Sequence, residues 1–216
     1  MNQTNWHYTT DKNAPAVITR GAYATPVWMQ NLWVGGEYAT YIQNNGCGHC
    51  CVAMAAMLHG VMIDPHREYA LCRDLWGLPK ENQGHWLPAA GVEKVLHHLG
   101  IPAISYGVAE DCARESTGKI LSALECGKLV IFASNPDDYP DNPFSDEYHW
   151  VMAVARGNDG NILIANSSLD AAPTGIQFVS PDAIEKALFR EAIAPKDMTW
   201  GEEARIHIGS GYVIVG

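Results

Sequence analysis

Basic residues are scarce in this chain of 216 residues. Lysine and arginine together number 14, against 24 aspartates and glutamates, so the formal net charge is −10. Proteins that bind nucleic acids or anionic membrane surfaces carry patches rich in lysine and arginine. The composition therefore argues against nucleic acid and against anionic lipid as partners.

Long hydrophobic runs are also missing. The longest ones, around residues 52–58 and 129–133, are much shorter than the roughly 20 apolar residues that cross a bilayer as a helix. Residues 1–8 contain neither the basic part nor the apolar part of a secretory signal. We therefore expect no membrane span and a cytoplasmic location.

Cysteine is too sparse for a disulfide scaffold. Six cysteines in a chain of this length do not resemble the small, cysteine-dense secreted domains that disulfides hold together. Cys47 and Cys50 have the spacing of half a zinc site, with His49 or His59 as further ligands, but no second Cys-x-x-Cys pair exists. We therefore expect reduced thiols, no bound metal and no organic cofactor.

The order of the sequence patterns predicts an α+β fold. Helical hydrophobic patterns cover residues 48–58, 65–76, 87–99 and 115–127. Strand-like segments follow at residues 129–134, 149–155, 162–165, 177–179 and 211–216, and short strands are predicted at 26–29 and 38–42. Helices followed by an antiparallel sheet are typical of the α+β class. With 47% hydrophobic and 18% charged residues, we expect one globular domain over residues 1–216.

The helix predicted at residues 48–58 has no polar face, which indicates that it is buried in the middle of its domain. Cys47 lies at its first turn, between Gly46 and Gly48. Unpaired backbone N–H groups and the helix dipole favour a thiolate at such a position. Cys47 is therefore a candidate nucleophile.

A cysteine nucleophile needs a base, a group that orients the base, and donors for the developing oxyanion. His149 begins a strand directly after a long loop, and Asn166 ends the partner strand of the same predicted hairpin. We expect His149 to be the base and Asn166 to orient it, with His85 as the rival base and Asp170 as the alternative orienting group. Gln43, or else Asn44 or Asn45, is the candidate oxyanion donor beside the Cys47 N–H.

Residues 47–60, Cys-Gly-His-Cys-Cys-Val-Ala-Met-Ala-Ala-Met-Leu-His-Gly, resemble the Cys-Gly-x-x-x-x-Ala-Met-x-x-x-x-x-Gly opening of a family of papain-like cysteine peptidases. The branch is the bacterial one that processes bacteriocins with double-glycine leaders. Its nucleophile corresponds to Cys47. The segment from His149 resembles the strand with the family histidine, and residues 162–167 resemble the strand that ends in the third catalytic residue, here Asn166. The resemblance covers about residues 38–170.

Two departures from the family pattern leave alternatives open. The family glutamine lies six residues before the nucleophile, whereas Gln43 lies four before Cys47 and position 41 is tyrosine. The Cys47-Gly-His-Cys50 segment also resembles the Cys-Gly-Ser-Cys-Trp signature of papain relatives, in which the second cysteine attacks. On that alignment Cys50 is the nucleophile and Asn44 takes the place of the glutamine.

The resemblance implies a papain-like fold, in which a buried helix that carries the cysteine packs on a C-terminal antiparallel sheet. It also implies hydrolysis of peptide or amide bonds through Cys47, His149 and Asn166 and an acyl-enzyme, with a peptide or small protein as the partner. An acyltransferase or deamidase and a non-catalytic peptide-binding domain are the alternatives. No nucleotide-binding motif of a fused transporter is present, and the sequence does not indicate an oligomeric state.

Overall fold

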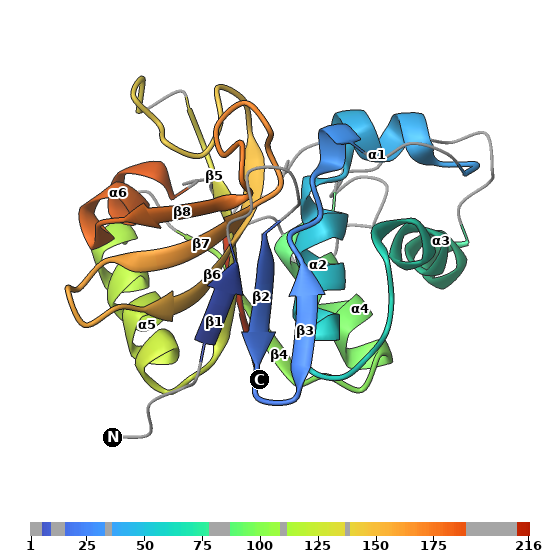
Figure 1. Ribbon diagram of the computed structural model, residues 1–216, viewed down its shortest axis with the longest axis horizontal. Coiled ribbons are helices and arrows are strands. Elements are labelled where there is room, and N and C mark those ends of the chain that lie inside the picture. The colour runs from blue at the N-terminus through green and yellow to red at the C-terminus, as the bar shows by residue number, and fades with distance from the viewer. Residues whose placement is uncertain are drawn as a thin grey trace.

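A six-stranded antiparallel sheet with the order β4-β9-β5-β6-β7-β8 forms the centre of the fold (Figure 1). The computed structural model describes residues 6–9, 16–32, 36–77, 87–108, 112–136, 139–188 and 211–216. The strands of the large sheet are β4 (Ala103–Tyr106), β5 (Leu129–Ser134), β6 (His149–Arg156), β7 (Ile162–Asn166), β8 (Ile176–Val179) and β9 (Tyr212–Val215). A second sheet of three strands contains β1 (Trp6–Thr9), β2 (Val17–Arg20) and β3 (Tyr23–Pro26).

Helices cover both faces of the large sheet. They are α1 (Ala39–Asn45), α2 (Cys47–Met57), α3 (Pro65–Trp76), α4 (Ala89–His98), α5 (Ala113–Glu125) and α6 (Pro181–Ala187), with a short 3-10 helix at Gln30–Leu32. Successive residues of β5 point to opposite faces, so Ile131 packs with α2 and α4 whereas Phe132 packs with α5 and α6. The molecule therefore has three layers, with the sheet in the middle.

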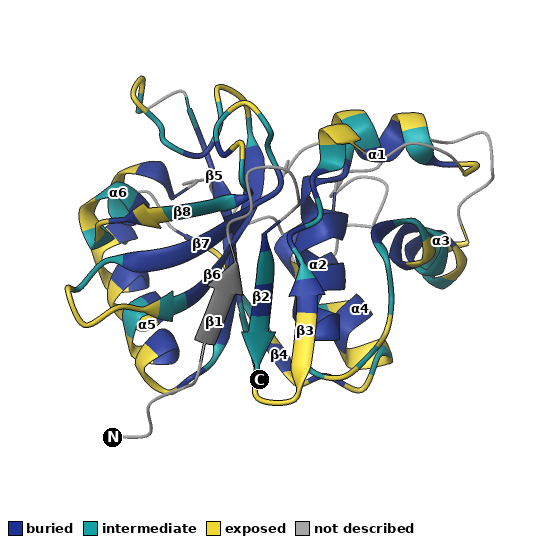
Figure 2. Ribbon diagram, in the orientation of Figure 1, coloured by how far each residue is buried: buried dark blue, intermediate teal, exposed yellow. Residues whose placement is uncertain are grey.

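Helix α2 is the most buried helix. Every residue from Cys47 to Met57 is buried, as the dark ribbon of Figure 2 shows. The helix contacts β3 and β6 and the helices α1, α3 and α4, so none of its sides faces solvent. This arrangement explains why its sequence has no polar face.

Capping residues set the bounds of two helices. The Asp64 side chain accepts a hydrogen bond from Arg67 N, Pro65 takes the first helical position of α3, and Gly77 ends the helix with a positive φ of 60°. Ser180 accepts from Ala183 N at the start of α6 in the same way. The bounds of these helices are thus set by residues at the helix ends themselves, without contacts from the rest of the fold.

The α+β class and the buried cysteine-bearing helix are confirmed, but the two short strands predicted before that helix are wrong. Residues 39–45 form α1 instead, because the N–H of Gly46 reaches back to Ile42 O over 2.8 Å and that of Ile42 to Tyr38 O over 3.0 Å. Strand β3 ends at Pro26, so residues 27–29 lie outside it. None of the described helices is both long and apolar enough to cross a membrane.

Candidate functional site

Cys47 is the first residue of α2 and lies beside the beginning of strand β6. The first N–H groups of a helix have no carbonyl within the helix to bind. The backbone groups of Cys47, Gly48 and Trp150 act on the Cys47 sulfur so as to lower the pKa of its thiol. One turn further, Cys51 Sγ donates to Trp150 O over 3.5 Å. These contacts hold the start of α2 against the first residues of β6.

Gly46 forms the one-residue junction between α1 and α2. A Cβ atom at this position would lie 2.3 Å from Ile42 O, which is backbone and cannot rotate away. Only glycine therefore allows α1 to end where α2 begins. Because of this short junction, Cys47 lies close to Gln43 and Asn44, and all three residues line one cavity.

His149 lies at the start of β6, and Asn166 at the end of β7, the neighbouring strand. The Nε2–H of His149 donates to Asn166 Oδ1 over 2.8 Å. The backbone N–H of Ser168 donates to the same oxygen over 2.9 Å. His149 is 5% exposed and Asn166 is completely buried. Because the proton of a neutral imidazole is on Nε2, Nδ1 is left as the basic nitrogen.

Both the oxygen and the nitrogen of the Asn166 amide form hydrogen bonds. Its Nδ2 donates to Phe144 O over 2.9 Å and to Gln177 Oε1 over 3.0 Å. Gln177 is fixed in turn, since its Nε2 donates to Pro143 O over 2.6 Å and to Ala171 O over 2.9 Å. The network determines which end of Asn166 is oxygen, and therefore which nitrogen of His149 carries the proton.

The loop before β6 is anchored to the sheet at its centre. Phe144 is completely buried and packs edge-on against Phe132 of β5, with ring centroids 5.4 Å apart. Asn142 donates to Ser134 Oγ over 2.8 Å and accepts from Phe144 N over 2.9 Å. These contacts place residues 142–148 along one side of the cavity.

The cavity has a volume of about 600 Å³. Cys47 and His149 both line it, together with polar side chains from four segments of the chain, residues 30–31, 43–44, 142–148 and 168–170. The lining residues are Gln30, Asn31, Gln43, Asn44, Cys47, Asn142, Pro143, Ser145, Asp146, Glu147, Tyr148, His149, Ser168, Asp170 and Ala171. Of the lining residues that the structure describes, three are carboxylates and none is lysine or arginine, so this described lining is acidic.

Burial governs the ionisation of both reactive groups. Desolvation lowers the pKa of His149 to about 4, and the hydrogen bond to Asn166 opposes this shift. Desolvation also raises the pKa of the Cys47 thiol, while the backbone groups of Trp150, Gly48 and Cys47 itself oppose the rise. Burial therefore favours a neutral thiol and a neutral imidazole before substrate binds.

The rival nucleophile lies elsewhere. Cys50 is 1% exposed and packs with Tyr38, Tyr41, Ile42 and Tyr69 on the side of α2 that faces α1 and α3. It is not among the residues that line the cavity. Burial raises the pKa of Cys50 well above the usual range of a thiol.

The remaining candidate site residues differ in whether they line the cavity. Gln43 and Asn44 line the cavity, whereas Asn45 is not among its lining residues. Asp170 is exposed at the cavity, and Asn166 rather than Asp170 receives the hydrogen bond of His149. His85 lies outside the described residues. All six cysteines are free thiols, and His59 bonds to Ala55 O and Arg20.

The sequence does not indicate the roles of Gln177 and of Phe144, which anchors the loop before β6. Gln177 meets Asn166 because β8 pairs with β7 in the register Ala165↔Ile176. That register depends on how the chain returns through residues 167–175, and an isolated glutamine in a short strand carries no signal for it.

The sequence matches no protein-family model, and no curated protein matches it either. Among solved structures, the fold is similar to that of a protein from Bacillus anthracis described as a C39-like peptidase, a name that itself rests on likeness. The similarity has a TM-score of 0.50 at 13% sequence identity and covers 97% of this chain and 98% of the other. At this identity it shows the fold alone. The fold is thus shared with a C39-like peptidase, while the bacteriocin-processing branch stays a prediction.

Proposed function

We propose that the protein is a cysteine peptidase that cleaves peptide or amide bonds through Cys47, His149 and Asn166. The observation that carries the proposal is the meeting of Cys47 and His149 in one cavity, with the Nε2–H of His149 held by Asn166. The fold likeness to a C39-like peptidase supports the same reaction class. A peptide is then the substrate.

The proposed mechanism follows from the assignment of His149 Nδ1 as the nitrogen that can accept a proton. The Cys47 thiol gives its proton to His149 Nδ1, and the sulfur attacks the substrate carbonyl carbon. The resulting oxyanion accepts a hydrogen bond from the Cys47 N–H and from the side-chain amide of Gln43. His149 then protonates the leaving amine, which leaves an acyl group on Cys47.

Water completes the cycle. His149 takes a proton from water, the hydroxide attacks the thioester, and the carboxylic acid product leaves as Cys47 recovers its proton. Asn166 keeps the imidazole ring in place through both halves of the reaction and stabilises the positive charge that forms on it. None of these steps needs a metal or an organic cofactor.

The test compares Cys47→Ala with Cys50→Ala on a fluorogenic peptide library and with iodoacetamide. Cys47→Ala should lower kcat by about 10³-fold or more and remove the alkylated site, as loss of a nucleophile does. Cys50→Ala should change both results little, because Cys50 is buried away from the cavity. Hydrolysis that survives Cys47→Ala and disappears with Cys50→Ala would assign the nucleophile to Cys50.

A separate experiment shows whether water or an amine accepts the acyl group from Cys47. Products formed with and without an added primary amine distinguish hydrolysis, in which a free acid accumulates, from acyl transfer, in which an amide does. Normal peptide binding with neither product, together with no reaction of Cys47 with an activated-ester probe, would instead support a non-catalytic peptide-binding domain.

A further inference from the structure

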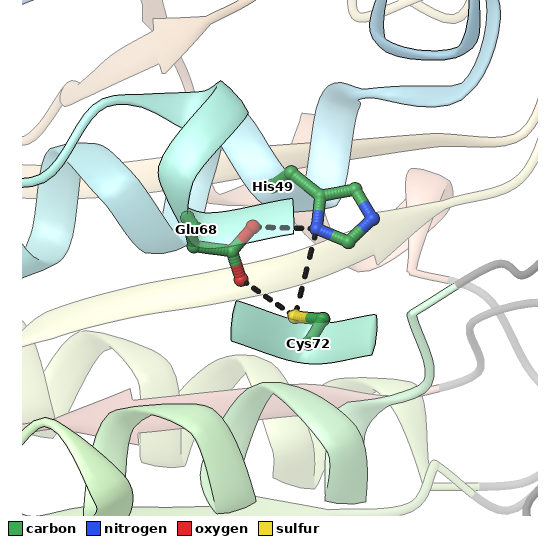
Figure 3. A group of neighbouring side chains, drawn as sticks. All are labelled: His49, Glu68 and Cys72. Carbon is green, nitrogen blue, oxygen red and sulfur yellow. Dashed lines mark hydrogen bonds and ion pairs between the residues drawn. The ribbon is translucent and has the colours of Figure 1, made fainter. Parts of the chain in front are cut away.

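A second group of reactive side chains is buried between α2 and α3, apart from the cavity. His49 Nδ1 lies 2.5 Å from Glu68 Oε2, Cys72 Sγ lies 3.0 Å from Glu68 Oε1, and Cys72 Sγ lies 3.9 Å from His49 Nδ1 (Figure 3). The exposed fractions of His49, Glu68 and Cys72 are 2%, 0% and 3%. None of the three lines the cavity, so the proposed peptidase chemistry does not use them.

The positions of these residues follow from the helices. Glu68 and Cys72 are four residues apart on α3 and therefore share one of its faces. His49 comes from the first turn of α2, which contacts that face. The ring of Tyr69 lies 4.9 Å from the ring of His49 at 74° and packs against it edge-on. The imidazole is thus held with Nδ1 toward α3.

We propose that His49 Nδ1, the Glu68 carboxylate and Cys72 Sγ bind a divalent metal ion of the zinc class. One atom from each residue lies within 4.8 Å of the other two. Imidazole nitrogen, carboxylate oxygen and thiolate sulfur are the ligands that Zn²⁺ takes in proteins. One carboxylate and one thiolate also balance the charge of a divalent ion, which a buried site requires.

The distances fit such a site after a small adjustment. Ligands at about 2.0–2.3 Å from a tetrahedral ion are roughly 3–4 Å apart. The two separations that involve Cys72 already lie in this range. Only His49 and Glu68 are closer, at 2.5 Å. Binding the ion replaces the proton between His49 and Glu68 and the thiol proton of Cys72.

The thiol is what distinguishes this group from a buried ion pair. A histidine and a glutamate at 2.5 Å satisfy each other and need no third group. A neutral thiol is a weak hydrogen-bond donor and adds little to that pair, whereas a thiolate is a strong zinc ligand. The ion would connect α3 to the first turn of α2 through His49, which is two residues after Cys47. It would stabilise the start of α2 without contacting the substrate.

The experiment uses the Cys47→Ala protein, so that the cavity thiol cannot bind the metal. After treatment with a chelator, the protein is titrated with Co²⁺, and the thiolate-to-cobalt charge-transfer absorption is recorded. We expect one ion per chain, displacement of Co²⁺ by Zn²⁺, loss of the absorption with an added Cys72→Ser substitution, and at least about tenfold weaker binding with Glu68→Gln. Cys112→Ser, at a half-buried cysteine before α5, is the matched control and should leave the titration unchanged.

Two results would overturn the proposal: no charge-transfer absorption in the Cys47→Ala protein, or an absorption that persists with Cys72→Ser. If Cys72→Ser does not fold, X-ray absorption spectroscopy of the Co²⁺-loaded Cys47→Ala protein replaces it. One sulfur in the coordination shell is then expected, and a shell without sulfur contradicts the site. These readouts do not depend on peptidase activity, so failure of either proposal leaves the other standing.

Discussion

The oxygen and the nitrogen of the Asn166 amide face different partners, and the oxygen faces His149. Oδ1 accepts from His149 Nε2–H over 2.8 Å, while Nδ2 donates to Phe144 O and Gln177 Oε1. A carboxylate has no N–H and therefore cannot replace the amide here. The hydrogen bonds at this position therefore require an amide rather than a carboxylate.

Asn166→Asp should impair the protein although it keeps the acceptor for His149. The second carboxylate oxygen would face two acceptors, Phe144 O and Gln177 Oε1, in a completely buried place. We expect a loss of about 2–3 kcal/mol in the free energy of unfolding, measured by urea denaturation. The same substitution at exposed Asn158 is the control and should change it by less than about 0.5 kcal/mol. Equal effects at the two positions would contradict the hydrogen-bond assignment.

Hydrolysis should stay active to an unusually low pH. Burial lowers the pKa of His149 to about 4, so its imidazole remains neutral and able to accept the Cys47 proton well below pH 6.5. The acid limb of kcat/KM against pH should therefore lie nearer 4 than 6.5. The alkaline limb should lie above the usual pKa of a thiol, because burial raises the pKa of Cys47.

Asn166→Ala tests the direction in which the hydrogen bond to Asn166 shifts the pKa of His149. The hydrogen bond from His149 to Asn166 raises the pKa of the imidazole, so its removal should move the acid limb to still lower pH while kcat falls. A shift of the limb toward higher pH would show that another group controls it.

Gly46→Ala should disrupt the site through sterics alone. The new Cβ would lie 2.3 Å from Ile42 O, so α1 and α2 must separate. We expect a loss of roughly 1–3 kcal/mol in the free energy of unfolding and a lower kcat. Gly118→Ala, on the exposed side of α5 with nothing within 4 Å of its Cβ, should instead stabilise the protein by up to about 1 kcal/mol. Thermal denaturation of both variants measures the difference in sign.

The acidic cavity should favour cationic peptides. Asp146, Glu147 and Asp170 line it, and none of the other described lining residues is lysine or arginine. Peptides with Arg or Lys near the scissile bond should therefore have a higher kcat/KM than their Glu counterparts. The preference should shrink as salt is added, because exposed charges are screened over about 10 Å at 0.1 M.

Glu147→Gln should reduce this preference. Glu115→Gln makes the same chemical change on the surface of α5, where Glu115 pairs with Lys119, and should leave the preference intact. A preference that survives Glu147→Gln, or that falls equally with Glu115→Gln, would show that the lining carboxylates do not select the substrate.

Local patterns predict the elements well where the signal lies within the segment. The apolar helix after Cys47, the capped helix from Pro65 and the strands at 129 and 149 all appear near their predicted bounds. The strand predicted at residues 38–42 is helix α1 instead, and the buried residues of this helix are the neighbours Tyr41 and Ile42 rather than alternate residues, as a half-buried strand would have. The contacts of Gln177 and of the group around Glu68 depend on how two separate elements pack against each other, which the periodicity of each segment does not record.

The place of β9 has a consequence for biosynthesis. This strand is the last described element of the chain, yet it lies inside the sheet, paired with β4 on one side and β5 on the other. A ribosome-bound nascent chain that ends before residue 212 already contains Cys47, His149 and Asn166 but leaves β4 unpaired and one edge of β5 open. Because such non-local pairing forms late, the thiol should gain its finished surroundings only after residues 212–215 have left the exit tunnel.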